Sequence, residues 1–199
     1  MRVTVPRDEA RPDTGGEAPS GSPHSGRSWR QRRLDRRRRV RQDLLAAQAA
    51  ELHTIRSIAG AARELVAAGW LQNGWYAHRT PSGLGHVTSA HAAERFHDSP
   101  VVAACLVGAI VHAGGGATAA HTQPVQRAIT LTWHTLFADP TDRVRWCSPP
   151  AERAARVREL TSWNDHPGRA QHHVIDLLRT VEEAAVSHAI DTRSRLLEP

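Results

Sequence analysis

The 199-residue chain has room for one domain with appendages, because domains commonly contain about 100 to 150 residues. Its net charge of +6 arises from 26 arginines, with no lysine, against 20 acidic residues. Two cysteines are too few for a disulfide framework, and no apolar run reaches the roughly 18 residues that would span a bilayer. We therefore expect a cytoplasmic protein with no transmembrane segment.

The N-terminal segment, residues 1–29, is predicted to be disordered. Residues 1–28 contain four Pro, four Gly and four Ser, with almost no apolar residue after Val5. Such a segment cannot bury enough surface to offset the entropy lost on ordering. Residues 30–53 are rich in Arg, Leu, Ala and Gln, which favour helix, and predict an arginine-rich helical arm.

The predicted helix continues to about residue 68 and ends at Gly69. Its second half carries an apolar stripe at helical spacing, formed by Ile55, Ile58, Ala59, Ala62, Leu65 and Val66. From residue 70 to 98 glycine and proline interrupt the pattern repeatedly, so we expect a long irregular or short-stranded connection there.

Four further helices are predicted, at residues 101–113, from 123 to about 138, at 151–162 and from 170 to 185. The first is apolar on nearly every side, and the others have one apolar face at helical spacing. The predicted fold class is therefore all-α, a compact bundle of about five helices with a long irregular connection, preceded by the disordered arginine-rich N-terminal arm. We assign residues 54–188 to the helical domain and 189–199 to a C-terminal tail.

The excess positive charge lies in the arm. Nine arginines fall between residues 27 and 41 against one acid, Asp35, whereas residues 42–199 contain 14 arginines and 15 acids. Guanidinium groups at this density suit phosphate backbones, where counterion release gives affinity with little sequence information. The alternative is a solvated charge run that contacts acidic lipid or only improves solubility. The arginines predicted to bind DNA or RNA are Arg30, Arg32, Arg33, Arg36, Arg37, Arg38, Arg39 and Arg41.

A polar sequence from Trp163 to Arg169 stands directly before the last predicted helix. Asn164 or Asp165 can cap that helix by accepting hydrogen bonds from its free amides, while Pro167 fits the first turn. Trp163 can fill the core beside the cap. The alternative is a pocket with Asp165 as general base or Arg169 as phosphate clamp. The residues of this predicted pocket are Trp163, Asn164, Asp165, Arg169, Trp70 and Tyr76.

Three short patterns follow one another along the chain: Gly-Trp…Tyr-Ala, Cys-x-x-Gly-Ala, and Trp-Asn-Asp-x-Pro-Gly-Arg before an amphipathic helix. Together they resemble a domain-of-unknown-function family of small proteins from high-GC Gram-positive bacteria and their phages and plasmids. The resemblance covers roughly residues 54–186 and implies no activity, cofactor or catalytic residue. The matching positions are Gly69, Trp70, Gln72, Tyr76, Ala77, Cys105, Gly108, Ala109, Trp163, Asn164, Asp165, Pro167, Gly168 and Arg169.

Other residues that carry chemistry form no motif. The histidines lack the short fixed spacing of zinc ligands, so no metal or cofactor is predicted, although His86, His91, His97 and Asp98 share the irregular segment. Cys105 lies in an apolar run that should bury its thiol and raise its pKa. We therefore expect a non-enzymatic accessory or regulatory protein that binds nucleic acid and a protein partner. The alternative is a small hydrolase or transferase with a cleft around Asp165, Arg169 and the loop histidines.

Overall fold

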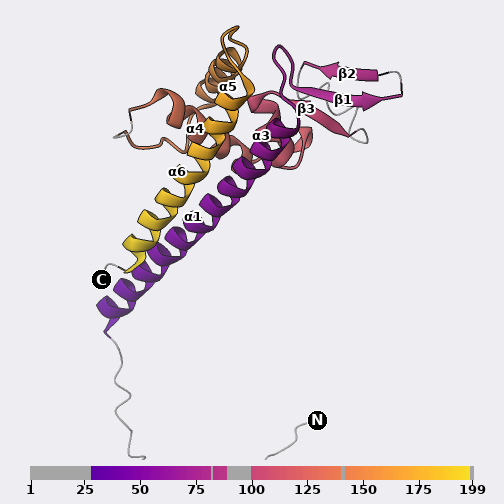
Figure 1. The fold of residues 1–199 in the computed structure, drawn as a ribbon. Coiled ribbons are helices and arrows are strands. Elements are labelled where there is room, and N and C mark those ends of the chain that lie inside the picture. Colours follow the sequence, from indigo (N-terminus) through magenta and orange to yellow (C-terminus); the bar gives the residue numbers. More distant parts are fainter. Residues whose placement is uncertain (1–27, 82, 89–99, 140–141, 198–199) are drawn as a thin grey trace, which may run out of the picture. The chain divides into compact units, whose positions relative to one another are not determined.

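A computed structural model describes residues 28–81, 83–88, 100–139 and 142–197. The disorder predicted for residues 1–27 lies outside the described residues. Contacts divide the chain into two units, residues 1–38 and 39–199, with the boundary inside the first helix. Figure 1 shows the elements, which are α1 (Trp29–Ala68), β1 (Tyr76–Thr80), β2 (Gly83–Val87), β3 (Val101–Ala104), α3 (Leu106–Ala113), the 3-10 helix η2 (Ala117–Ala119), α4 (Gln123–Phe137), α5 (Pro150–Asn164) and α6 (Gln171–Leu197).

Helix α1 confirms the predicted helix between about 30 and 68. The Ser28 hydroxyl accepts a hydrogen bond from the Gln31 amide at 3.4 Å, as an N-cap does. Gly69 follows the helix as predicted, but the reason is a close approach, because a Cβ there would lie 2.3 Å from the Val102 carbonyl oxygen. The buried residues of the helix recur at helical spacing and are Ala49, Leu52, Ile55, Ile58, Ala59, Ala62 and Val66.

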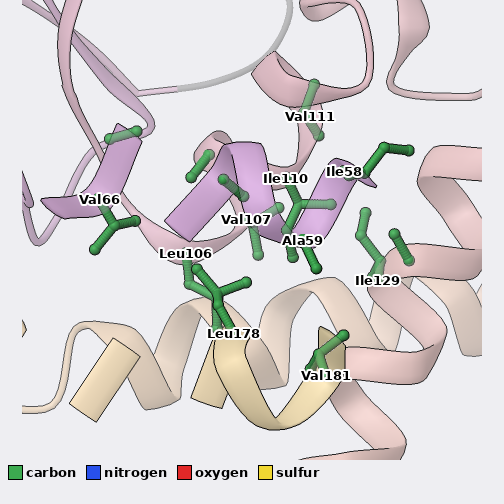
Figure 2. Close-up of a cluster of buried hydrophobic side chains, with 14 of the residues drawn as sticks. Ile58, Ala59, Val66, Leu106, Val107, Ile110, Val111, Ile129, Leu178 and Val181 are labelled. Atoms are coloured by element: carbon green, nitrogen blue, oxygen red, sulfur yellow. The ribbon is translucent and has the colours of Figure 1, made fainter. Parts of the chain in front are cut away.

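Helix α3 lies in the middle of the hydrophobic core. Every residue from Leu106 to Val111 is buried, so this short helix packs against neighbours on all sides. A helix that is apolar all round is typical of such a central position. Figure 2 shows its side chains beside those of three other helices, namely Ile58, Ala59 and Val66 of α1, Ile129 of α4, and Leu178 and Val181 of α6.

Helix α6 runs antiparallel beside α1 (Figure 1). The Gln171 side chain donates to the Val66 carbonyl at 2.7 Å, and further along α6 the Glu182 carboxylate accepts from Arg63 Nε at 2.7 Å. The helix continues to Leu197, so it includes most of the segment predicted as a C-terminal tail, and its Thr192 is buried. The division of the chain into a tail, an arm, a helical domain and a C-terminal tail stays a prediction.

The fold is mostly helical, with five α-helices among the described residues, as predicted, but a three-stranded antiparallel sheet in the order β2-β1-β3 shows that it is not all-α. β1 and β2 form a hairpin inside the connection expected to be irregular or short-stranded. β3 lies where the first turn of a helix was predicted, over residues 101–104. A short apolar run does not distinguish helix from strand by pattern alone, and pairing of Ala104 with Tyr76 of β1 makes this one a strand.

Candidate functional site

The turn between α5 and α6 contains the residues predicted as a cap or a pocket. α5 extends to Asn164, and the Asp165 amide donates to the Thr161 carbonyl at 2.9 Å as the C-cap. The prediction that Asn164 or Asp165 caps the last helix is therefore wrong, because both residues end the preceding one. Pro167 lies in the turn, and α6 begins only at Gln171.

Asn164 is fully buried at the centre of this region. Its Oδ1 accepts from Trp70 Nε1 at 2.9 Å and from the Leu106 amide at 3.1 Å, where α3 begins. Its Nδ2 donates to the Leu71 carbonyl at 3.1 Å and to Asp165 Oδ1 at 2.8 Å. A side-chain amide has two acceptor positions and two donor hydrogens, so all four are used. Asn164 thus joins α5 to α3 and to the chain after α1.

The loop after α1 adds three further hydrogen bonds to the same turn. Gln72 Nε2 donates to the carbonyls of Asn164 and His166, at 3.0 and 2.9 Å. The Asn73 amide donates to Asp165 Oδ1 at 3.0 Å, with Asn73 itself in the left-handed region at φ 57°. Asn tolerates that conformation better than most residues. The Asp165 carboxylate therefore accepts hydrogen bonds from two groups of the fold, the Asn73 amide and the Asn164 side chain. These bonds disfavour its use as a general base.

Arg169 lies over the Trp163 ring, with its guanidinium carbon 3.7 Å from the ring centroid. Its Nε also donates to the Trp163 carbonyl at 3.2 Å. Such stacking is a stabilising cation–π contact, and it fixes the guanidinium against its own turn. The predicted role as a phosphate clamp stays untested, and the contacts of Arg169 assign it to the structure of the turn.

Tyr76, the sixth predicted pocket residue, lies apart from the Asn164 hydrogen bonds. Its ring is buried on β1 with the rings of His78 and His112 each 6.0 Å away. Burial raises the pKa of its hydroxyl, which has no hydrogen-bond partner among the described residues. The structure thus joins Trp70, Asn164 and Asp165 by hydrogen bonds, and Tyr76 takes no part in these bonds.

Cys105 is buried, as predicted, and caps α3. Its Sγ accepts a hydrogen bond from the Gly108 amide at 3.3 Å. Burial raises the pKa of the thiol to about 12, so the reactive thiolate is scarce at neutral pH. Gly108 in turn has no space for a side chain, because a Cβ would lie 2.2 Å from the Trp75 carbonyl oxygen. The Cys-x-x-Gly pattern is therefore a packing requirement at the start of α3.

The eight arginines of the predicted nucleic-acid interface all lie on α1 and are all exposed. Within residues 28–38, Arg30, Arg33 and Arg37 follow at spacings of three and four, which places them on one helix face. The Arg33 guanidinium carbon is 5.5 Å from the centroid of the Trp29 ring, and that ring is 66% exposed. The arm is therefore a helical surface of guanidinium groups with an accessible indole.

Sequence reasoning missed two adjacent hollows on residues 39–199. The first has a volume of about 720 Å³ and lies between α1 and the start of α4, and the second has a volume of about 550 Å³ and lies beside Cys147. Gln123, Arg127 and Trp146 line both. No local pattern in the sequence marks these hollows, because their lining residues come from α1, from the start of α4 and from the segment around Trp146.

The described residues offer little for a metal or a membrane. Among them, no group of three or more His, Cys, Asp or Glu side chains is placed to hold a metal ion. His86 is exposed on β2, while His91, His97 and Asp98 lie outside the described residues. None of the helices described is both long enough and apolar enough to cross a bilayer.

Comparison with known proteins returns one family model. It is described as a family of unknown function, DUF6197, and it matches residues 50–184. No curated protein and no solved structure matches the chain. The matched range includes the Asn164 hydrogen bonds, Cys105 and Gly108, and excludes the arginine arm.

Proposed function

Because the chain belongs to DUF6197, a family of unknown function, we propose a function from its own side chains: a non-enzymatic accessory or regulatory protein whose arginine helix binds nucleic acid. The observation that carries this proposal is the exposure of all eight arginines from Arg30 to Arg41 on α1. The helical body would supply contacts with a protein partner. The arm would supply affinity for DNA or RNA without reading its sequence.

The density of charge on the arm is close to that of a duplex. Residues 30–38 include six arginines, and nine helical residues rise by about 13 Å, so one positive charge falls on every ~2 Å. Double-stranded DNA carries one negative charge per ~1.7 Å of its axis. A helix of this kind laid along the backbone would release condensed counterions along its whole length, which is the main source of non-specific affinity.

Binding of an anionic partner would also reduce the repulsion between the arginines of the arm. Arg32 and Arg36 stand four residues apart on the helix, as do Arg33 and Arg37, and like charges at this spacing destabilise a helix by a few tenths of a kcal/mol per pair. Asp35 is the one acid in the segment. Phosphates would neutralise these repulsions, so binding would strengthen the helix that makes the contact.

The small-enzyme alternative receives no specific support from the geometry. Asp165 and Arg169 are both committed to the turn between α5 and α6. A hydrolase or transferase would need a cleft between these side chains and the loop histidines, two of which, His91 and His97, lie outside the described residues. It remains an untested prediction.

The test replaces the eight arm arginines in the full-length chain. The variant with all eight changed to Gln keeps helix-forming residues but removes the charge, and the matched control changes the same eight to Lys. At about 50 mM salt we expect the Gln variant to bind a labelled DNA duplex at least ~100-fold more weakly, whereas the Lys control stays within about tenfold of the parent. Fluorescence anisotropy measures the Kd.

The arm proposal fails if the Gln variant binds as tightly as the parent. The eight positions are exposed, so a thermal melt should show the same Tm for all three proteins. A loss of affinity in the Lys control equal to that in the Gln variant would also contradict the proposal, because neutralisation of phosphates requires only the charge.

A further inference from the structure

The two hollows beside Trp146 share three lining residues, Gln123, Arg127 and Trp146, and we refer to the pair together as the Trp146 groove. We propose that it binds an unpaired nucleotide of a single-stranded nucleic acid, with the base stacked on the indole of Trp146. This inference rests on the proposed function, because it names the form of nucleic acid that the body would take. It adds a second contact, separate from the arm.

The groove has the size of a ligand site. Its two parts, of about 720 and 550 Å³, each fall within the ~300 to 1,000 Å³ of small-molecule sites. Apolar side chains of α1, including Leu44 and Ala47, form one wall of the larger part. Trp146 lines both parts, so a base in one part and a phosphate in the other would both lie beside it.

Trp146 is held in place and only half-buried. Its ring meets that of His188 on α6 at 6.1 Å between centroids, with the two planes at 80°. Arg153 ties down the same loop, because its Nη1 donates to the Ser148 carbonyl at 2.6 Å. A fixed aromatic ring at the edge of a groove is what base stacking requires, and the π-face of any base can use it.

Arginines lie in and near the groove. Arg127 and Arg153 line it, and Arg143 and Arg145 are exposed on either side of Val144, next to Trp146 in sequence. On α1, Arg41 precedes the lining residue Leu44 by three residues, a rise of about 4.5 Å. The carboxylate of Glu51, which also lines the groove, is already paired with Arg127. The surplus of arginine therefore complements a polyanion at this site.

The polar side chains of the groove favour a nucleotide over an acidic peptide. The amide nitrogens of Gln123 and Gln126 donate to Glu51 Oε1 and to the Ala120 carbonyl, at 2.9 and 2.6 Å. Their carbonyl oxygens are then presented as fixed acceptors, which suit the N–H donors of bases. An acidic peptide would engage the arginines but would not need the indole. A base in a duplex is stacked on its neighbours, so the partner must be unpaired.

The test measures binding of the full-length chain to a labelled oligothymidylate of about 15 nucleotides and to a duplex of equal length. We expect Trp146→Ala to weaken single-strand binding by about 5- to 100-fold, as loss of one stacked base does, and to leave duplex binding unchanged. Trp146→Phe should restore most of the affinity. Arg145→Gln should weaken single-strand binding by about tenfold at most, and the matched control Arg158→Gln, an exposed arginine on α5 that lines neither hollow, should change nothing.

The same variants in the chain with eight Gln in the arm separate this inference from the arm proposal. If Trp146→Ala weakens single-strand binding in that chain while the arm changes alone do not weaken binding, the groove inference is supported and the arm proposal fails. If only the arm changes matter, the groove inference is overturned. It is also overturned if Trp146→Ala weakens duplex and single-strand binding equally, or if poly-glutamate displaces the oligothymidylate from the arm-neutral chain as well as unlabelled oligothymidylate does.

Discussion

At the scale of single residues, the polar side chains around the turn between α5 and α6 connect different elements by hydrogen bonds. Asn164 uses all four of its hydrogen-bonding positions on α3, the loop after α1 and its own neighbour. Asp165 and Gln72 add bonds across the same turn. Two segments that lie 58 residues and more than 90 residues from Asn164 in sequence therefore depend on its buried amide.

Replacement of Asn164 by Ala should lower the free energy of unfolding by about 3 to 5 kcal/mol, because buried donors and acceptors on three segments lose their partners. Asp165→Ala should cost only about 1 to 2 kcal/mol, and Asp165→Asn less, since its amide oxygen can still accept from Asn73. Urea unfolding followed by circular dichroism measures all three. An Asp165→Ala protein with unchanged stability would instead revive a catalytic role for this carboxylate.

Cys105 should make the stability of the fold depend on pH in the alkaline range. Burial raises its pKa to about 12, whereas an unfolded thiol ionises near pH ~8.5 to 9. Between these values the unfolded chain has lost a proton that the folded chain keeps. Below about pH 8.5 the Cys105 thiol therefore does not lower the free energy of unfolding. Above that pH its ionisation in the unfolded chain lowers the free energy of unfolding by about 1.4 kcal/mol per pH unit.

Replacement of Cys105 by Ser should make the free energy of unfolding less dependent on pH in this range. Serine does not titrate in this range, and its hydroxyl can still accept from the Gly108 amide. At pH 10 the free energy of unfolding should fall more steeply with pH in the parent than in the Cys105→Ser variant, by roughly 1 kcal/mol per pH unit. Cys147→Ser is the matched control, because that thiol is exposed. Equal slopes for the parent and both variants would refute the assignment.

At the scale of elements, the helices followed from local pattern and the sheet did not. Apolar spacing and the prolines at the starts of α4 and α5 predicted three of the helices closely, and apolar spacing predicted the start of α6 but not its end at Leu197. Val101–Ala104 looked helical because its neighbours in sequence are equally apolar, and only its pairing with β1 decides otherwise. Likewise, no local signal predicts that Gln72 meets the residues around 164, because that contact spans 92 residues.

Two glycines on these elements should respond oppositely to alanine. Gly108→Ala places a Cβ 2.2 Å from the Trp75 carbonyl oxygen, and backbone cannot easily move, so we expect a loss of at least about 2 kcal/mol. At Gly60, inside α1, the nearest atom to a Cβ is Glu182 Oε2 at 3.4 Å. Gly60→Ala should therefore stabilise the protein by up to about 1 kcal/mol through helix propensity. Thermal melts compare the two, and equal effects would contradict the packing described for α3.

At the scale of the whole molecule, positive charge and folded core occupy different parts of the chain. Residues 42–199 are close to neutral, whereas residues 27–41 hold nine arginines and one acid. The family match begins at residue 50 and so excludes that segment. The proposed binding to nucleic acid therefore combines a charge-driven arm with a body that has its own site, the Trp146 groove. Contacts through the arm should depend far more on salt than stacking in the groove.

The salt dependence of duplex binding tests the central claim most directly. Each neutralised phosphate contributes about −0.9 to the slope of log K against log salt concentration. With most of its eight arm arginines engaged, the full-length chain should give a slope of about −4 to −7, the Lys control a similar slope, and the Gln variant a slope near zero. A Gln variant that retains the slope of the parent would show that the arm does not make the contact.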